Sequence, residues 1–235
     1  MLEIKNLSFC APNGYQILKD FNHTFQKGIT VVTGQNGSGK TTLSKLLIGA
    51  IKPTSGEILF NGTNITKLPI NERANLGITI AFQQPIKFKG ITVQRLLDIA
   101  GKETTSVTEA CSYLSKVGLC ARDYINREFN NTLSGGELKR IELAIALAKG
   151  GEIFIFDEPE AGIDIWSFEG LTNLFESLKD KTVIIVSHNK KIIDIADHVV
   201  LLNKNAPPKT GTKKELAKLI EEQTCKVQRE GVWTT

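Results

Sequence analysis

Gly34-Gln35-Asn36-Gly37-Ser38-Gly39-Lys40-Thr41-Thr42 fits the phosphate-binding pattern G-x-x-x-x-G-K-[ST], the P-loop, without a mismatch. Such a loop turns its backbone N–H groups inward around phosphate oxygens. Glycine permits this because it has no Cβ to clash where φ is positive or where a phosphate comes close. The stretch therefore predicts a phosphate-binding loop. The alternative is a Gly-rich turn between a strand and a helix, with a solvated lysine.

The residues on either side of the loop favour the first interpretation. A β-branched run, Ile29-Thr30-Val31-Val32-Thr33, enters the loop. Apolar residues follow it at helical spacing, namely Leu43, Leu46, Leu47 and Ala50. Strand, loop and helix is the order that the motif requires. We expect the helix N-terminus to attract phosphate, Lys40 to reach the β- and γ-phosphates, and the Thr41 hydroxyl to bind Mg²⁺.

Composition is that of an ordinary globular protein, with 41% hydrophobic and 23% charged residues in a chain of 235. The net charge of +4 is too weak to indicate nucleic acid, so no nucleic-acid partner is expected. The four cysteines are scattered without C-x-x-C spacing, which argues against a disulfide framework or a zinc site. Because no apolar run approaches ~18 residues and the start lacks a signal-peptide pattern, we expect a cytoplasmic protein.

The pattern along the chain predicts an α/β fold. Residues 2–9 and 17–25 read as strands of an N-terminal antiparallel β layer, and Asn61-Gly62 predicts a hairpin after the strand at 56–60. Three apolar strands alternate with helices, at 77–82, 153–156 and 183–186. This alternation predicts a mostly parallel sheet covered on both faces.

The same pattern predicts how the domain is divided. Helical periodicity from 92 to about 116 predicts a small helical subdomain inserted between strands. We expect an ATP-binding core at 1–84 and 132–205, the inserted subdomain at 85–131, and a C-terminal helix and tail at 206–235. The short amphipathic helix of that last part is predicted around 216–220.

Two carboxylates follow the apolar strand at 153–156. Asp157-Glu158 alone would indicate a helix N-terminus with favourable negative charge. Beside a P-loop, four apolar residues followed by Asp-Glu form the Walker B pattern. In that pattern Asp157 lies near the Mg²⁺ of bound ATP and Glu158 can polarise a water molecule.

Leu133-Ser134-Gly135-Gly136-Glu137, followed by an amphipathic helix, resembles the signature motif of ATP-binding-cassette (ABC) ATPases. The resemblance covers nearly the whole chain. Gln83 matches the family's Q-loop glutamine, Asp164 its D-loop aspartate and His188 its switch histidine. Two structural alternatives stand beside this reading: Ser134 and Glu137 also fit a helix capping box, and His188 could be an ordinary histidine at a strand end.

The resemblance implies a P-loop ATPase in which two chains close head to tail over two ATP molecules. Ser134, Gly135, Gly136, Glu137 and Asp164 would contact nucleotide across that interface. Mg²⁺ would be held by Thr41, Gln83 and Asp157. Glu158 would activate water, His188 would contact the γ-phosphate, and Gln83 would couple the nucleotide to the helical subdomain. Without ATP we expect a monomer.

The chain departs from the family at the base-binding position. An aromatic residue usually stacks on adenine in the loop after the first strand, and Ala11 stands there. Base stacking is worth ~1 to 3 kcal/mol, so we expect weak base selection unless Phe9 or Tyr15 takes over.

The partner is predicted from two further stretches. Residues 80–86 with Gly90, and 135–142 with Glu137 and Glu142, resemble the ATPase subunit of the Suf iron-sulfur cluster assembly system, which implies a soluble scaffold partner. Ala11 also suits that subfamily. The segments 159–161 and 187–189 and a short inserted subdomain are less similar to it. The alternative is an ABC transporter subunit bound to a transmembrane permease, at the inner face of the membrane. Charge, length and the lack of a second cassette argue against a nucleic-acid repair or translation ATPase.

Overall fold

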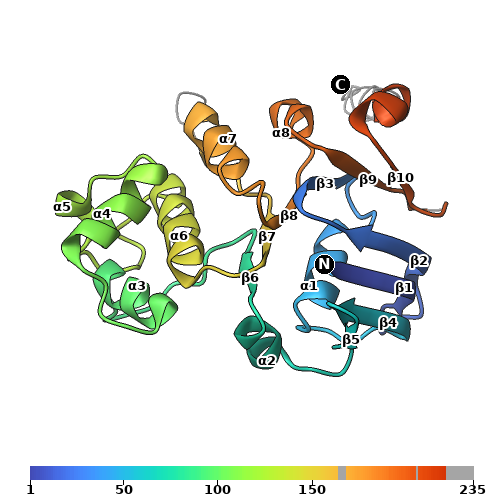
Figure 1. The fold of residues 1–235 in the computed structure, drawn as a ribbon, viewed down its shortest axis with the longest axis horizontal. Coiled ribbons are helices and arrows are strands. Elements are labelled where there is room, and N and C mark those ends of the chain that lie inside the picture. The colour runs from blue at the N-terminus through green and yellow to red at the C-terminus, as the bar shows by residue number, and fades with distance from the viewer. Residues whose placement is uncertain (164–167, 205, 221–235) are drawn as a thin grey trace, which may run out of the picture.

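The computed structural model describes residues 1–163, 168–204 and 206–220, which form two β-sheets with helices around them (Figure 1). The strands are β1 (Leu2–Cys10), β2 (Gln16–Phe25), β3 (Gly28–Gly34), β4 (Ser55–Phe60), β5 (Thr63–Asn64), β6 (Ile78–Ala81), β7 (Ile153–Asp157), β8 (Thr182–Val186), β9 (His198–Leu202) and β10 (Lys209–Gly211). The helices are α1 (Lys40–Leu47), α2 (Ile70–Asn75), α3 (Val93–Gly101), α4 (Val107–Lys116), α5 (Ala121–Tyr124), α6 (Gly135–Lys149), α7 (Phe168–Glu176) and α8 (Lys190–Asp194).

The N-terminal sheet is antiparallel in the order β2-β1-β4-β5, which confirms the predicted β layer. Its β4–β5 hairpin turns at Asn61 and Gly62, whose φ angles are 48° and 83°. A type I′ turn requires positive φ at both central residues, and Asn-Gly tolerates it. The predicted hairpin is therefore confirmed.

The second sheet has the order β10-β9-β3-β8-β7-β6, and all its pairs are parallel except β10 with β9. The mostly parallel sheet is confirmed. The sequence did not predict β10, since its three residues follow a Lys- and Pro-rich stretch and become a strand only by pairing with β9. The P-loop follows the carboxyl end of β3, Asp157-Glu158 lies at that of β7, and His188 follows that of β8. These three strands are neighbours in the sheet, in the order β3-β8-β7.

Apolar residues cover both faces of this parallel sheet, as alternation along each strand demands. In β7, Phe154 and Phe156 face a core formed with α6, α7 and α8. Ile153 and Ile155 face the other core, which α1 and the antiparallel sheet complete. The continuous apolar run at 153–156 thus packs into the cores on both faces of the sheet.

The helices α3, α4 and α5 gather with part of α6 at the end of the molecule away from the antiparallel sheet (Figure 1). The predicted helical stretch from 92 to 116 is two helices, because Lys102 ends α3 at φ 63° and Ser106 begins α4 with a capping box. Helix α6 packs against α3 and α4 and also against β6. It therefore joins the region predicted as an inserted subdomain to the parallel sheet.

Two further features complete the description. The chain is helical over 213–220, which includes the helix predicted around 216–220. None of the helices in the described parts of the chain is long and apolar enough to cross a membrane.

Candidate nucleotide site

The P-loop joins β3 to α1, as its motif requires. Gly39 occupies the N-cap of α1 at φ 97°, where a side chain would be strained. A Cβ on Gly34 would come within 2.3 Å of the Leu202 carbonyl oxygen, so this position has room only for glycine. The first backbone N–H groups of α1 consequently point into the loop, where an anion can bind them.

Lys40 is buried at the start of α1, and its Nζ donates to the backbone oxygens of Gly34 and Gln35 at 2.8 and 3.1 Å. Burial lowers the pKa of Lys40, while the nearby carboxylates of Glu158 and Asp157 raise it. A buried cation that donates to backbone carbonyl oxygens in this way is poised to exchange those contacts for phosphate oxygens.

Asp157 ends β7 and is only 2% exposed. Burial, and then the neighbouring charge of Glu158, raise its pKa to about 6. The nearby Thr41 hydroxyl acts against this rise in the pKa, and within the described residues Oδ1 of Asp157 has no hydrogen-bond partner. A buried carboxylate oxygen without a partner beside a hydroxyl is a donor set that suits Mg²⁺, which takes oxygen ligands.

Glu158 and Gln83 meet across the cleft. The Gln83 Nε2 donates to Glu158 Oε2 at 2.6 Å, and Glu158 has a φ of 46°, a conformation that is costly for a non-glycine residue. Both side chains line a cleft of about 250 Å³. It is lined by Ile17, Asn36, Gly37, Gly39, Lys40, Thr41, Thr42, Gln83 and Glu158. The structure thus brings the predicted phosphate, metal and water-activating residues together.

His188 lies just after β8 and is exposed. The residues around it are fixed, because the Ser187 hydroxyl donates to Glu160 Oε1 and accepts from the Asn189 N–H at 2.9 Å. Asn189 in turn caps α8. The histidine is therefore held at the strand end beside Glu160, whose other carboxylate oxygen is buried without a hydrogen-bond partner among the described residues.

The Ser134–Glu137 corner at the start of α6 forms the expected capping box. Ser134 accepts from the Glu137 N–H, and Glu137 accepts from the Ser134 N–H at 2.6 Å. Glu137 also accepts from the Tyr124 hydroxyl at 2.6 Å, and hydrogen bonds from Tyr124 and Ser134 lower its pKa to about 2. The carboxylate of Glu137 is thus committed within its own chain, while Ser134 and Gly135 are exposed.

The two glycines of this corner differ in their surroundings. A Cβ on Gly136 would lie 2.6 Å from the Gly162 carbonyl oxygen, whereas a Cβ on Gly135 would meet no described atom within 4 Å. None of residues 134–137 is among those that line the cleft beside Lys40. The predicted nucleotide contact of Asp164 lies outside the described residues.

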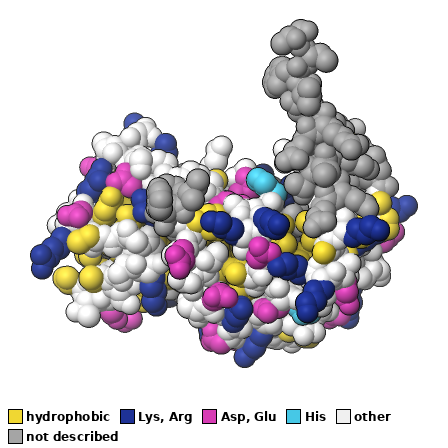
Figure 2. Space-filling view, turned by 90° about the horizontal axis from the view of Figure 1, so that it is seen from above, with side chains coloured by type: hydrophobic (Ala, Val, Ile, Leu, Met, Phe, Trp, Pro, Cys, Tyr) yellow, Lys and Arg dark blue, Asp and Glu magenta, His cyan; other side chains and the backbone are white. Residues whose placement is uncertain are grey.

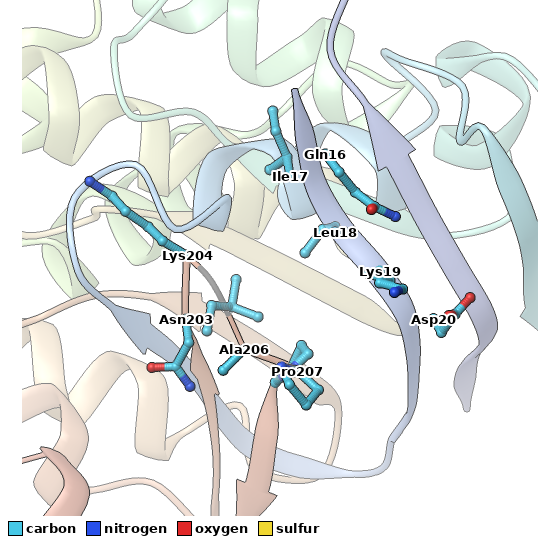
Figure 3. A pocket seen from close by; sticks show the side chains of 11 residues that line it. Gln16, Ile17, Leu18, Lys19, Asp20, Asn203, Lys204, Ala206 and Pro207 are labelled. Atoms are coloured by element: carbon cyan, nitrogen blue, oxygen red, sulfur yellow. The ribbon is translucent and has the colours of Figure 1, made fainter. Parts of the chain in front are cut away.

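A second hollow of about 480 Å³ adjoins the cleft at Ile17, between β2 and the segment after β9 (Figure 3). Lys204 extends from that segment toward the P-loop, where its Cε would lie 3.2 Å from a Cβ on Gly37. Near Ala11, Phe9 packs against the core, and Tyr15 is 48% exposed. Of the two aromatic residues suggested for adenine, Tyr15 is therefore the more exposed, and Phe9 is partly buried.

Sequence reasoning did not predict the contacts of three charged residues, of which Arg73 and Lys139 are buried and Glu142 is half-buried. Arg73 supports the end of α1, and Lys139 and Glu142 of α6 contact the ends of β6 and β7. The sequence held one indication of the role of Lys139, because this lysine directly follows Leu138 of the apolar stripe of α6.

On the face shown in Figure 2, basic and acidic side chains are interspersed.

The fold and the site define a P-loop nucleoside triphosphatase with the cassette architecture. A family model described as "ABC transporter" matches residues 18–161. The chain is 35% identical to the "Uncharacterized ABC transporter ATP-binding protein MJ0035" of Methanocaldococcus jannaschii, over 96% of this chain and 94% of that one. It is also 34% identical to the "Probable ATP-dependent transporter ycf16" of Trieres chinensis, with 94% of each chain covered. The chain therefore belongs to the ABC transporter family and is an ABC-type ATPase, an ATP hydrolase.

Solved structures show the same fold. The dimeric ABC transporter cassette MJ0796 superposes with a TM-score of 0.81 at 23% identity, covering 90% of this chain and 98% of that one. A bacterial Atm1-family ABC exporter with ATP bound gives a TM-score of 0.85 at 21% identity and covers 97% of this chain. The chain spans 42% of the length of that exporter chain.

Proposed function

We propose that two copies of this chain close head to tail over two ATP molecules, and that hydrolysis opens them again. The observation that carries the proposal is the Ser134–Glu137 corner. Its capping box leaves Ser134 and Gly135 exposed at a helix N-terminus, outside the cleft of its own chain. A helix N-terminus binds anions, so a neighbour's γ-phosphate suits it. Contacts that need the γ-phosphate favour the closed state only until that phosphate leaves.

Within one cleft, the P-loop N–H groups and Lys40 would hold the phosphates. Mg²⁺ would be bound by Thr41, Asp157 and Gln83, and it would neutralise charge on the β- and γ-phosphates. Gln83 would serve both Glu158 and the metal, since its amide N–H₂ donates to Glu158 while its amide oxygen would be the metal ligand. This bond orients Glu158, which would position and deprotonate the attacking water.

His188 and the second subunit would complete the site. The histidine at the end of β8 would contact the γ-phosphate, and Gly136 and Asp164 would contribute from the neighbouring chain. In this arrangement a lone subunit binds ATP and hydrolyses it slowly. Closing is therefore the step that assembles the catalytic geometry.

We further propose that the motion acts on a soluble Suf-type scaffold in the cytoplasm. Two stretches carry the resemblance to the Suf ATPase, and the structure places one residue of each in contact: the Phe82 N–H donates to Glu142 Oε1 at 2.9 Å. Ile86 and Phe88, just beyond Gln83, are exposed apolar side chains that could be covered by a partner. The second candidate, a transmembrane permease, is favoured by the relatives named as ABC transporter proteins. Capture from the native host followed by identification of the bound protein separates a soluble scaffold from a polytopic membrane protein.

The composite site is tested by Gly135→Asp in the background of Glu158→Gln. Glu158→Gln is expected to bind ATP, to elute as a dimer with ATP, and to lose several orders of magnitude in turnover. Gly135→Asp places a negative charge where the neighbour's γ-phosphate would lie. The monomer should tolerate it, because a Cβ there meets no described atom within 4 Å and an acidic residue suits a helix N-terminus.

The double variant is therefore expected to bind ATP with unchanged affinity and to remain monomeric. Gly170→Asp is the matched control, since Gly170 lies in α7 and a Cβ there also meets no described atom within 4 Å. This control in the same background should still dimerise with ATP. An ATP-dependent dimer that survives Gly135→Asp would refute the composite site, and an unchanged rate in Glu158→Gln would remove Glu158 from its role.

A further inference from the structure

The pairing of β6 with β7 stops just before the residues that lead into the site. Their hydrogen-bonded register ends with Ala81 opposite Phe156. The next residues, Phe82 and Asp157, precede Gln83 and Glu158 directly. Something outside the sheet must set the distance between the two strand ends, because Gln83 and Glu158 meet there at 2.6 Å.

Lys139 of α6 makes that connection. Its side chain is 1% exposed, and its ammonium group donates to the carbonyl oxygen of Phe82, to that of Asp157 at 3.4 Å, and to Glu142 Oε2 at 3.2 Å. An ammonium group has three protons, so all three are used. Lys139 thus takes the place of the next backbone hydrogen bonds between the two strands, with one N–H donor for the residue that follows β6 and one for the last residue of β7.

Glu142 completes the arrangement one turn further along α6. Its Oε2 neutralises Lys139, and its Oε1 accepts from the Phe82 N–H at 2.9 Å. Both backbone groups of Phe82 are therefore held by this one ion pair. A buried ion pair contributes little to stability compared with apolar residues of similar size, and specific placement of backbone is what such a pair supplies here.

We propose that Lys139 and Glu142 are positioning residues for ATP hydrolysis, which hold the strand ends carrying Gln83 and Glu158 at the separation that catalysis needs. The inference rests on the proposed roles of Gln83 and Glu158. Lys139 lies four residues after Gly135, about 6 Å along α6. In the proposed dimer, docking of the helix N-terminus on a neighbour's phosphate would reach Glu158 through this helix.

The test compares Lys139→Met with Lys149→Met in the full chain. Lys149 lies on the same helix, and its Nζ donates to the Ile78 carbonyl oxygen and the Thr79 hydroxyl at 2.9 and 3.0 Å. Both lysines therefore bind the β6 strand, but Lys149 binds its far end. Steady-state and single-turnover ATPase rates, KM for ATP and the melting temperature are measured for each variant.

Lys139→Met is expected to lower kcat about 100-fold with KM for ATP within about threefold of wild type, because misplacement of a reacting group affects the chemical step rather than phosphate binding. Lys149→Met should keep kcat within about threefold, even if it melts at a lower temperature. Amide hydrogen exchange should speed up at residues 82–85 in the first variant only. Equal losses of kcat in the two variants, or a loss confined to KM, would overturn the inference.

Glu142→Gln provides a second arm should Lys139→Met not fold. Glutamine keeps an acceptor for the Phe82 N–H but no longer neutralises Lys139, and we expect about 10-fold lower kcat with faster exchange at 82–85. A wild-type kcat in this variant would likewise overturn the inference. The proposed function is judged separately, by Glu158→Gln and Gly135→Asp, so a failure of either proposal can be recognised by itself.

Discussion

Arg73 supports the helix that carries the P-loop lysine, and its removal should destabilise the protein strongly. The side chain is 1% exposed, and its guanidinium donates to the carbonyl oxygens of Leu46 and Leu47 at 2.8 Å each. These are the last two residues of α1, and of their carbonyls that of Leu46 also accepts from the Gly49 N–H at 3.1 Å. Further bonds reach the Thr66 and Leu68 oxygens at 2.9 and 3.1 Å.

The size of the effect follows from these four bonds. In Arg73→Met the carbonyls of Leu47, Thr66 and Leu68 lose their side-chain donor, at about 1 to 3 kcal/mol apiece if they stay dry, while the Leu46 carbonyl keeps its hydrogen bond from the Gly49 N–H. Two terms offset part of this loss. Burial lowers the pKa of Arg73 to about 10, which shows that keeping the cation there is itself costly, and water can enter the vacated space. We therefore expect a net loss of about 4 kcal/mol, near the lower limit of the sum.

Thermal melting and urea unfolding measure this loss. For a chain of this size, 1 kcal/mol shifts the melting temperature by about 2 to 4 °C, so Arg73→Met should melt about 8 to 16 °C below wild type. Arg73→Lys should fall about halfway, because an ammonium group has three donors and lacks the guanidinium fork. Arg95→Met, an exposed control in α3, should change the free energy of unfolding by at most about 0.5 kcal/mol. If Arg73→Met melted within about 3 °C of this control, the reasoning would be refuted.

Further predictions concern pH, the signature glycine, the metal ligand and the base. Burial lowers the pKa of His23 from 6.5 to about 4, so the unfolded chain binds the proton first and stability falls as the pH drops through this window. His23 contributes at most about 2 kcal/mol to this loss between pH 7 and pH 5, while the raised pKa of Asp157 acts in the opposite direction; the difference between wild type and His23→Phe in urea titrations at both pH values measures the His23 contribution. Gly136→Ala should displace the Gly162 loop, since its Cβ would lie 2.6 Å from that carbonyl oxygen, and should abolish ATP-dependent dimerisation in gel filtration. Asp157→Asn should raise the Mg²⁺ concentration for half-maximal ATPase at least tenfold while nucleotide binding without metal persists; an unchanged Mg²⁺ dependence would contradict its role. Tyr15→Ala should change the affinity for ATP less than about twofold, and the protein should bind ATP and GTP about equally well. A strong preference for ATP would show that other residues bind the adenine base.

Much of the fold was predictable because its signals are local. The P-loop, the apolar run before Asp157 and the Asn61-Gly62 turn each state a backbone requirement within a few neighbouring residues. Adjacent parallel strands then carry their carboxyl-terminal residues to one edge of the sheet, so the gathering of Lys40, Gln83 and Glu158 follows once the strands are placed. The capping box at Ser134 was readable for the same reason.

The sequence by itself determined the architecture and the chemical class of the site, because periodicity, turn residues and glycine requirements act over short stretches of chain. Only the tertiary structure decided which charged side chains reach the strand ends. Arg73 contacts residues 26 and 27 positions away, Lys139 contacts Phe82 across 57 positions, and Gln83 meets Glu158 across 75. Such contacts arise when packing excludes water and leaves buried carbonyls in need of donors, and no local pattern records which distant residue will supply them.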